Sequence, residues 1–181
     1  YNRDIDDLII DRFRFGRNGV NIKRHKETCE KMIAPNLPEV HVGVLAKYIE
    51  NADEAYLSLK EALVHSAAAI NAKVNIHWIS AEDVENCKRG VGRYFEDLHA
   101  LIVPGGFDCR GVEGKIRGVK WAREHKLPFL GICLGLQCAV IEFVRTVLTQ
   151  DANSIEFDPN TPNPVVHFVA GQEELTEKSA N

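Results

Sequence analysis

Residues 128–137 read PFLGICLGLQ, a short apolar run that is predicted to continue as a helix. Its single cysteine, Cys133, has one glycine two residues before it and another two residues after it. This is the spacing of a nucleophile elbow, a sharp strand-to-helix turn that leaves no room for side chains at the flanking positions. The spacing predicts that Cys133 lies at a helix N-terminus, which favours its thiolate, and that the Leu134 N–H faces a developing oxyanion. An ordinary buried cysteine in a strand–helix turn is the alternative.

Apolar strands and amphipathic helices alternate around this stretch. We expect strands over residues 42–46, 74–79, 98–103 and 129–132, and helices over residues 53–70, 81–87, 112–125 and 134–148. The alternation predicts an α/β fold, a doubly wound and mostly parallel sheet with helices on both faces. In such sheets ligands bind beyond the carboxyl ends of the strands. Residues 1–39 are predicted to be a linker or N-terminal extension with a short helix over 22–33, and residues 40–181 to form the domain.

Composition narrows the function. The chain has 181 residues and a net charge of -4, so no basic field favours nucleic acid as a partner. No apolar run approaches the roughly 20 residues that span a bilayer, so no membrane partner is expected. The five cysteines include no C-x-x-C pair, which predicts neither a disulfide framework nor a metal site and favours a reducing, cytoplasmic location.

A second glycine-rich loop follows the predicted strand over 98–103. Residues 104–111 read PGGFDCRG, and the two adjacent glycines let a backbone N–H approach a substrate without a side chain in the way. The carboxyl ends of parallel strands share one edge, so we expect the N–H of Gly106 to be a second oxyanion donor opposite Cys133. A tight turn with no site is the alternative. The sequence is not a P-loop, because no G-K-[ST] follows, and Cys109 is expected to be incidental because it lacks the elbow.

The two motifs VPGGF and GICLGLQ resemble those of the triad-type class I glutamine amidotransferases, which are flavodoxin-like α/β proteins. More narrowly, the sequence is similar to the C-terminal glutaminase domain of the CTP synthase family. Four further stretches support this narrower resemblance, which covers about residues 41–166: LAKY at 45–48, LVHS at 63–66, RGVEGK at 110–115 and DANSIEF at 151–157.

The resemblance implies a role for each matching residue. Cys133 matches the nucleophile, which attacks the γ-amide carbon of glutamine to give a glutamyl thioester and ammonia. The backbone N–H groups of Gly106 and Leu134 match the oxyanion donors, and Glu156 matches the carboxylate that holds the α-ammonium of the substrate. The residues implied to line the glutamine site are Gly106, Phe107, Leu134, Gly135, Leu136, Gln137 and Glu156.

The resemblance also implies partners and ligands beyond this domain. In the family, ammonia passes to an N-terminal synthase domain of the same polypeptide, which activates UTP with ATP and Mg and is absent from this sequence. GTP is an allosteric activator that acts near the loop after Phe107. The domain itself is expected to need no cofactor, and the full-length protein to form a homotetramer or filament.

The sequence departs from the family pattern in four ways. Asp108 stands where the family has glycine, and Leu136 replaces the commoner Met, a volume-conserving change. One position is missing after Leu148. The His-Pro-Glu motif that supplies the base and its orienting acid is absent, although residues 167–172 resemble the strand leading into it. We therefore expect a discontinuity or truncation after about Val166, and we assign no general base.

Two other functions stay open at this level. One is a different triad-type amidotransferase or a γ-glutamyl hydrolase, against which the stretches at 110–114 and 153–157 argue. The other is a non-catalytic assembly or regulatory module that has lost its histidine.

Overall fold

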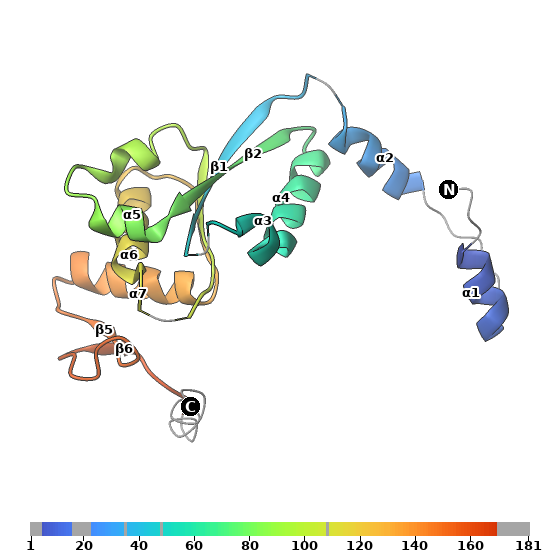
Figure 1. Cartoon of the computed structure of the whole chain (residues 1–181). Helices are drawn as coiled ribbons and strands as arrows, with labels where there is room; N and C mark the ends of the chain where they lie inside the picture. Colours follow the sequence, from blue (N-terminus) through green and yellow to red (C-terminus); the bar gives the residue numbers. More distant parts are fainter. Residues whose placement is uncertain (1–4, 16–22, 35, 48, 108, 170–181) are drawn as a thin grey trace.

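A four-stranded parallel sheet forms the centre of the molecule (Figure 1). The computed structural model describes residues 5–15, 23–34, 36–47, 49–107 and 109–169. The strands are β1 (Glu39–Ala46), β2 (Lys73–Ser80), β3 (Ala100–Val103) and β4 (Phe129–Gly131), in the spatial order β2-β1-β3-β4. All three pairings are parallel. The order is that of flavodoxin-like doubly wound sheets, so the predicted fold class is confirmed.

The strands differ in length from the predicted ones. β1 and β2 pair over eight residues each, from Glu39 opposite Lys73 to Ala46 opposite Ser80. They are longer than the apolar runs because backbone pairing continues past the buried residues. β3 begins at Ala100 and not at residue 98, since the Leu98 N–H donates to the Phe95 carbonyl (3.1 Å) in a turn.

Helices cover both faces of the sheet. On one face, α4 (Leu57–Ala69) packs on side chains of β1 and β3, and on the other lie α5 (Ala81–Asn86), α6 (Val112–Glu124) and α7 (Leu134–Thr146). The first core contains Val42, Val44, Ala46 and Ile102. The second contains Leu45, Leu101, Val103, Val112, Ile116, Val119, Ala122, Leu134, Cys138 and Ile141. Successive residues of β1 therefore enter opposite cores, as the two-residue period of a strand requires.

Two details of the helices test the sequence patterns. The single helix predicted over 53–70 is wrong: it is divided into α3 (Ala52–Ala55) and α4. The break falls at Tyr56, whose φ of -119° and ψ of 27° are not helical and whose ring stacks on Trp78 of β2 with centroids 5.8 Å apart. Ser80 is the N-cap of α5, because its hydroxyl accepts the N–H of Asp83 (3.1 Å).

The ends of the chain contribute short elements. α1 (Ile5–Phe13) and α2 (Lys23–Met32) precede the sheet, α2 matches the helix predicted over 22–33, and α2 contacts α4. A 3₁₀ helix, η1 (Val91–Tyr94), lies between α5 and β3 in the sequence. After α7 come β5 (Asn153–Ser154) and β6 (Pro164–Val166), which pair in parallel and contact α7. The predicted division of the chain at residue 39 stays a prediction.

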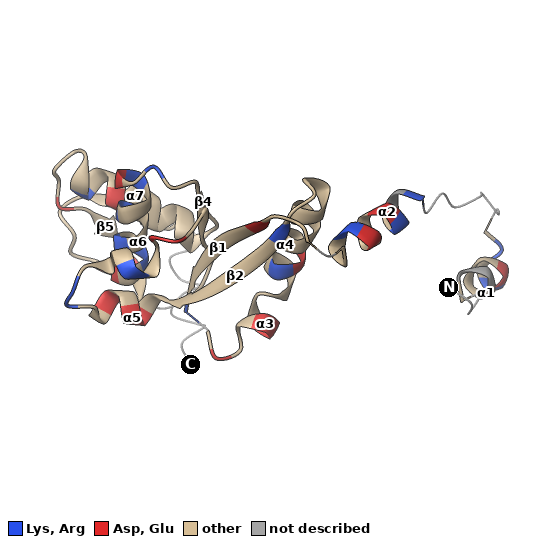
Figure 2. Cartoon of the chain, turned by 90° about the horizontal axis from the view of Figure 1, so that it is seen from above, with Lys and Arg blue, Asp and Glu red and all other residues tan. Residues whose placement is uncertain are grey.

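Charged residues lie mainly on the helices, and β1 and β2 are almost free of them (Figure 2). This distribution agrees with a sheet buried between two helical layers. Within the described ranges, no helix has the length and apolar character needed to cross a membrane.

Candidate functional site

The turn between β4 and α7 has the strained geometry that the G-x-C-x-G spacing predicts. β4 ends at Gly131, α7 begins at Leu134, and Cys133 between them has φ 53° and ψ -112°. A positive φ is uncommon for a residue with a side chain, and it persists where the surroundings enforce it. Cys133 is exposed, so it is not the ordinary buried cysteine of the alternative interpretation.

The surroundings that enforce this geometry are backbone atoms against the two elbow glycines. A Cβ atom at Gly131 would lie 2.7 Å from the carbonyl carbon and oxygen of Gly135. A Cβ atom at Gly135 would overlap the carbonyl oxygen of Val103 and lie 2.7 Å from its carbonyl carbon. Because these obstacles are backbone, they cannot rotate away, and glycine is required at both positions.

The Pro104–Phe107 loop lies directly against the elbow. It leaves β3, the strand next to β4, so both loops emerge at the carboxyl edge of the sheet. A Cβ atom built at Gly105 would be 3.4 Å from Cβ and 3.9 Å from Sγ of Cys133. The structure therefore brings the two glycine-rich motifs together, although they are more than twenty positions apart in the sequence.

At this junction, some backbone N–H groups donate no hydrogen bond to the described residues, and those of Gly106 and Leu134 are among them. Next to Leu134, the N–H of Gly135 donates to Ile132 O (2.9 Å) and the N–H of Leu136 to Cys133 O (3.0 Å). The N–H groups of Leu134 and Gly106 take part in no hydrogen bond within the part of the chain that the structure describes. Leu134 is the first residue of α7, where helix geometry leaves N–H groups without intrahelical partners. These are the two donors that the resemblance implies, and they are available to a ligand.

Two lysines hold the carbonyl side of the loop. Lys115 of α6 is completely buried, and its Nζ donates to Pro104 O at 2.7 Å and Gly105 O at 3.4 Å. Lys47, which follows β1 and is 8% exposed, donates from Nζ to Phe107 O at 2.7 Å. The sequence motifs assign no role to either lysine. The signal for Lys115 was its position at helical spacing among Val112, Ile116 and Val119, on the buried side of α6.

Burial changes the acidity of two groups here. It lowers the pKa of Lys115 from 10.5 to about 8, and the Lys47 ammonium acts in the same direction. Burial raises the pKa of Cys138 to about 11, although the two lysines oppose this shift. Cys138 is therefore a protonated thiol of the core at neutral pH.

The other predicted glutamine-site residues next to the elbow are split between surface and core. Phe107 and Leu136 are 83% and 59% exposed, so both side chains can meet a ligand. Gln137 is partly exposed, whereas Leu134 and Gly135 are buried and offer only backbone. Asp108, the departure in this loop, lies outside the described residues.

Glu156 follows β5 on a segment fastened to α7 by Arg145. The Arg145 guanidinium donates from Nε to Ala152 O (2.7 Å) and from NH1 to both carboxylate oxygens of Glu113 (2.8 and 2.9 Å). The Glu156 N–H donates to the Ser154 hydroxyl (3.2 Å), and the Glu156 side chain is exposed. Among the described residues, no hydrogen bond or ion pair joins Glu156 to Cys133 or to the Pro104–Phe107 loop, so its substrate role stays a prediction.

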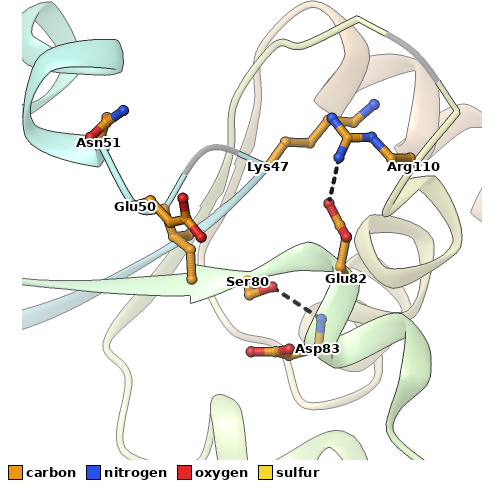
Figure 3. Close-up of a pocket in the computed structure, with 8 residues that line it drawn as sticks. Lys47, Glu50, Asn51, Ser80, Glu82, Asp83 and Arg110 are labelled. Carbon is orange, nitrogen blue, oxygen red and sulfur yellow. Dashed lines mark hydrogen bonds and ion pairs between the residues drawn. The ribbon is translucent and has the colours of Figure 1, made fainter.

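One hollow lies beside Lys47 and another lies beside the Pro104–Phe107 loop. A hollow of about 430 Å³ is lined by Lys47, Glu82 and Arg110, and Arg110 forms an ion pair with Glu82 (3.5 Å; Figure 3). A second hollow of about 300 Å³ is bounded by Gly105 and Ile132 and by residues of α3 and α4. The second hollow borders the elbow, whereas no predicted site residue lines the larger one. No group of three or more metal-binding side chains is found in the described ranges.

Comparisons with known proteins agree with this geometry. Residues 52–172 match the family described as glutamine amidotransferase class-I. A CTP synthase of Methanocaldococcus jannaschii is 51% identical over 158 residues, which are 84% of this chain and 29% of that protein. A CTP synthase of Rippkaea orientalis is 44% identical over 158 residues, which are 87% of this chain and 28% of that protein.

A solved structure is also similar. It is the glutaminase domain of a Trypanosoma brucei CTP synthase with bound acivicin, at a TM-score of 0.68 and 32% identity, and the match covers 72% of this chain and 50% of that one. The chain spans about three tenths of the length of the curated relatives that it matches.

Proposed function

Because the chain belongs to the class-I glutamine amidotransferase family, we propose that it hydrolyses L-glutamine as the glutaminase part of a CTP synthase. One observation carries the proposal. Cys133 stands exposed, with φ 53°, at the carboxyl edge of the sheet and against the Pro104–Phe107 loop. A sulfur nucleophile beside unpaired backbone N–H groups is the arrangement that acyl transfer requires.

The chemistry follows from this arrangement. The Cys133 thiolate forms a bond to the γ-amide carbon of glutamine, and the carbonyl electron pair moves onto oxygen. The N–H groups of Gly106 and Leu134 stabilise that oxyanion. When the carbon–nitrogen bond breaks, the nitrogen takes a proton and leaves as ammonia. Water then hydrolyses the thioester to glutamate and returns the thiol.

Proton transfer in this sequence of steps needs an imidazole, which the family supplies from a His-Pro-Glu motif. The 181 residues contain no such tripeptide, and we assign no residue of this sequence as the base. The remaining site residues bind the glutamine substrate. Glu156 holds the substrate α-ammonium by charge-assisted hydrogen bonds, Phe107 packs beside the substrate stem, and Leu134 to Gln137 line the pocket.

In the complete enzyme, the ammonia aminates UTP to CTP in a synthase domain that uses ATP and Mg. We further propose GTP as an activator acting near the loop after Phe107, a homotetramer or filament as the assembled state, and the cytoplasm as the location. The similarity of the chain to CTP synthases supports these statements.

The direct test is covalent labelling with acivicin, followed by peptide mapping, together with ammonia release from glutamine. We expect modification of Cys133 in the wild type and none in Cys133→Ala. Cys109, which is also exposed, serves as the internal control because it lacks the elbow. If labelling persists at Cys109 in the Cys133→Ala protein, the assignment of Cys133 as the nucleophile is wrong. Ammonia release by the full-length protein with UTP, ATP and GTP present, but without formation of CTP, would point to another amidotransferase. If the chain self-associates tightly and releases no ammonia, the result would favour the alternative of a non-catalytic assembly module.

A further inference from the structure

We propose that Lys115 is a positioning residue, which fixes the Gly105–Gly106 peptide so that its N–H, and not its carbonyl oxygen, is presented to the oxyanion. This inference rests on the proposed glutaminase function. Lys115 does not touch the substrate and acts through the loop.

The need for such a residue follows from the two glycines. A peptide between adjacent glycines lacks Cβ atoms that restrict φ and ψ, so its plane turns over easily. A turned peptide would place a carbonyl dipole where the oxyanion forms, which opposes the reaction. The oxyanion site formed by the Gly106 and Leu134 N–H groups therefore requires a group on the carbonyl side of the loop that prevents this rotation of the peptide plane.

Lys115 occupies that side. Its Nζ donates to Pro104 O at 2.7 Å and reaches Gly105 O at 3.4 Å. In a trans peptide the C=O and N–H bonds point in opposite directions, so the N–H groups of Gly105 and Gly106 are directed away from Lys115. The Gly106 N–H has no acceptor within the described residues.

The placement of Lys115 is costly and specific. The side chain is 0% exposed on a helix face that is otherwise apolar, and an ammonium group is buried only where partners hold it. At neutral pH it stays protonated, because its lowered pKa is still about 8. Lys47 secures the next carbonyl, that of Phe107, in the same way. The loop is thus fixed from the carbonyl side at Pro104, Gly105 and Phe107.

The test compares Lys115→Met, which keeps the length and removes the donor, with Lys115→Arg, which keeps charge and donors. Lys120→Met is the matched control, since Lys120 lies on the same helix and is 48% exposed. Ammonia release from glutamine reports the oxyanion-forming step. Iodoacetamide alkylation of Cys133 at a pH where the thiol is ionised reports the nucleophile without any oxyanion.

For Lys115→Met we expect kcat to fall at least about tenfold, part of the 10²–10³ that one lost oxyanion donor costs. KM and the alkylation rate should change less than about twofold. Lys115→Arg should recover most of kcat, and Lys120→Met should match the wild type. Equal losses in kcat and alkylation, or an unchanged kcat in Lys115→Met, would overturn the proposal.

A second readout does not depend on activity. In protein labelled with ¹⁵N-glycine, we expect the order parameter of Gly106 to fall from about 0.85, a rigid value, toward 0.6 in Lys115→Met alone. An unchanged order parameter would overturn the positioning role. If the wild type releases no ammonia, the glutaminase function fails, and the order parameter still decides the role of Lys115.

Discussion

The substitution Gly135→Ala tests the packing on which the elbow depends. A methyl group at Gly135 would overlap the carbonyl oxygen of Val103 and lie 2.7 Å from its carbonyl carbon. Val103 is fully buried in β3, and its carbonyl accepts the N–H of Ile132 (2.9 Å). The obstacle is therefore fixed backbone, and the start of α7 must move away from the sheet.

Two opposing effects set the magnitude. Alanine is the better helix former by about 1 kcal/mol. Overpacking against a fixed core costs about 3 kcal/mol, at the upper end of the usual range. The overlap prevails, and we expect a net loss of about 2 kcal/mol in the free energy of unfolding. For a chain of this size that corresponds to a fall of about 4–8 °C in Tm.

The assay is urea or thermal unfolding followed by far-ultraviolet circular dichroism. Gly90→Ala is the matched control, because a Cβ atom there meets nothing within 4 Å and its φ of -55° suits any residue. We expect that variant to be unchanged or more stable by up to about 1 kcal/mol. If Gly135→Ala is as stable as Gly90→Ala, α7 does not pack on β3 as described and the steric account of the elbow is wrong.

Three further predictions concern stability. Glu142→Gln should lower the free energy of unfolding by about 2 kcal/mol in urea titrations, because the buried carboxylate accepts charge-assisted hydrogen bonds from Arg123 (2.8 and 3.0 Å). Between pH 7.5 and 10 the unfolded chain binds more protons than the folded one at Lys115, since burial lowers its pKa from 10.5 to about 8. As the pH rises over that interval, the free energy of unfolding of the wild type should increase by about 2 kcal/mol relative to that of Lys115→Met. Parallel curves of unfolding free energy against pH for the two proteins would contradict this expectation. Ser80→Ala removes the acceptor of the Asp83 N–H and should lower the free energy of unfolding by about 1 kcal/mol. Asn86→Ala on the same helix should lower it by less.

Local patterns in the sequence were enough to predict most of the fold. The two-residue and 3.6-residue periods gave the four strands and the helices α5, α6 and α7 within a few positions. They failed at Tyr56, where nothing in the local pattern breaks the helix. The break accompanies the stacking of its ring on Trp78, which is twenty-two positions away.

The sequence is enough to predict that Cys133 sits on a strained turn, because the exclusion of a side chain at Gly131 by the backbone of Gly135 acts over four positions. The need for glycine at position 135 comes from the Val103 carbonyl of β3, so it depends on the tertiary structure, as does everything else around the turn. The approach of Gly105 to Cys133 depends on contacts between distant segments, and so does the burial of Lys47 and Lys115 behind the loop. A lysine on a helix is ordinarily solvated, and the sequence pattern alone predicts the same for Lys115. Lys115 faces the loop because the packing of α6 on the sheet leaves its Nζ no other acceptors than the carbonyls of Pro104 and Gly105 within the described residues.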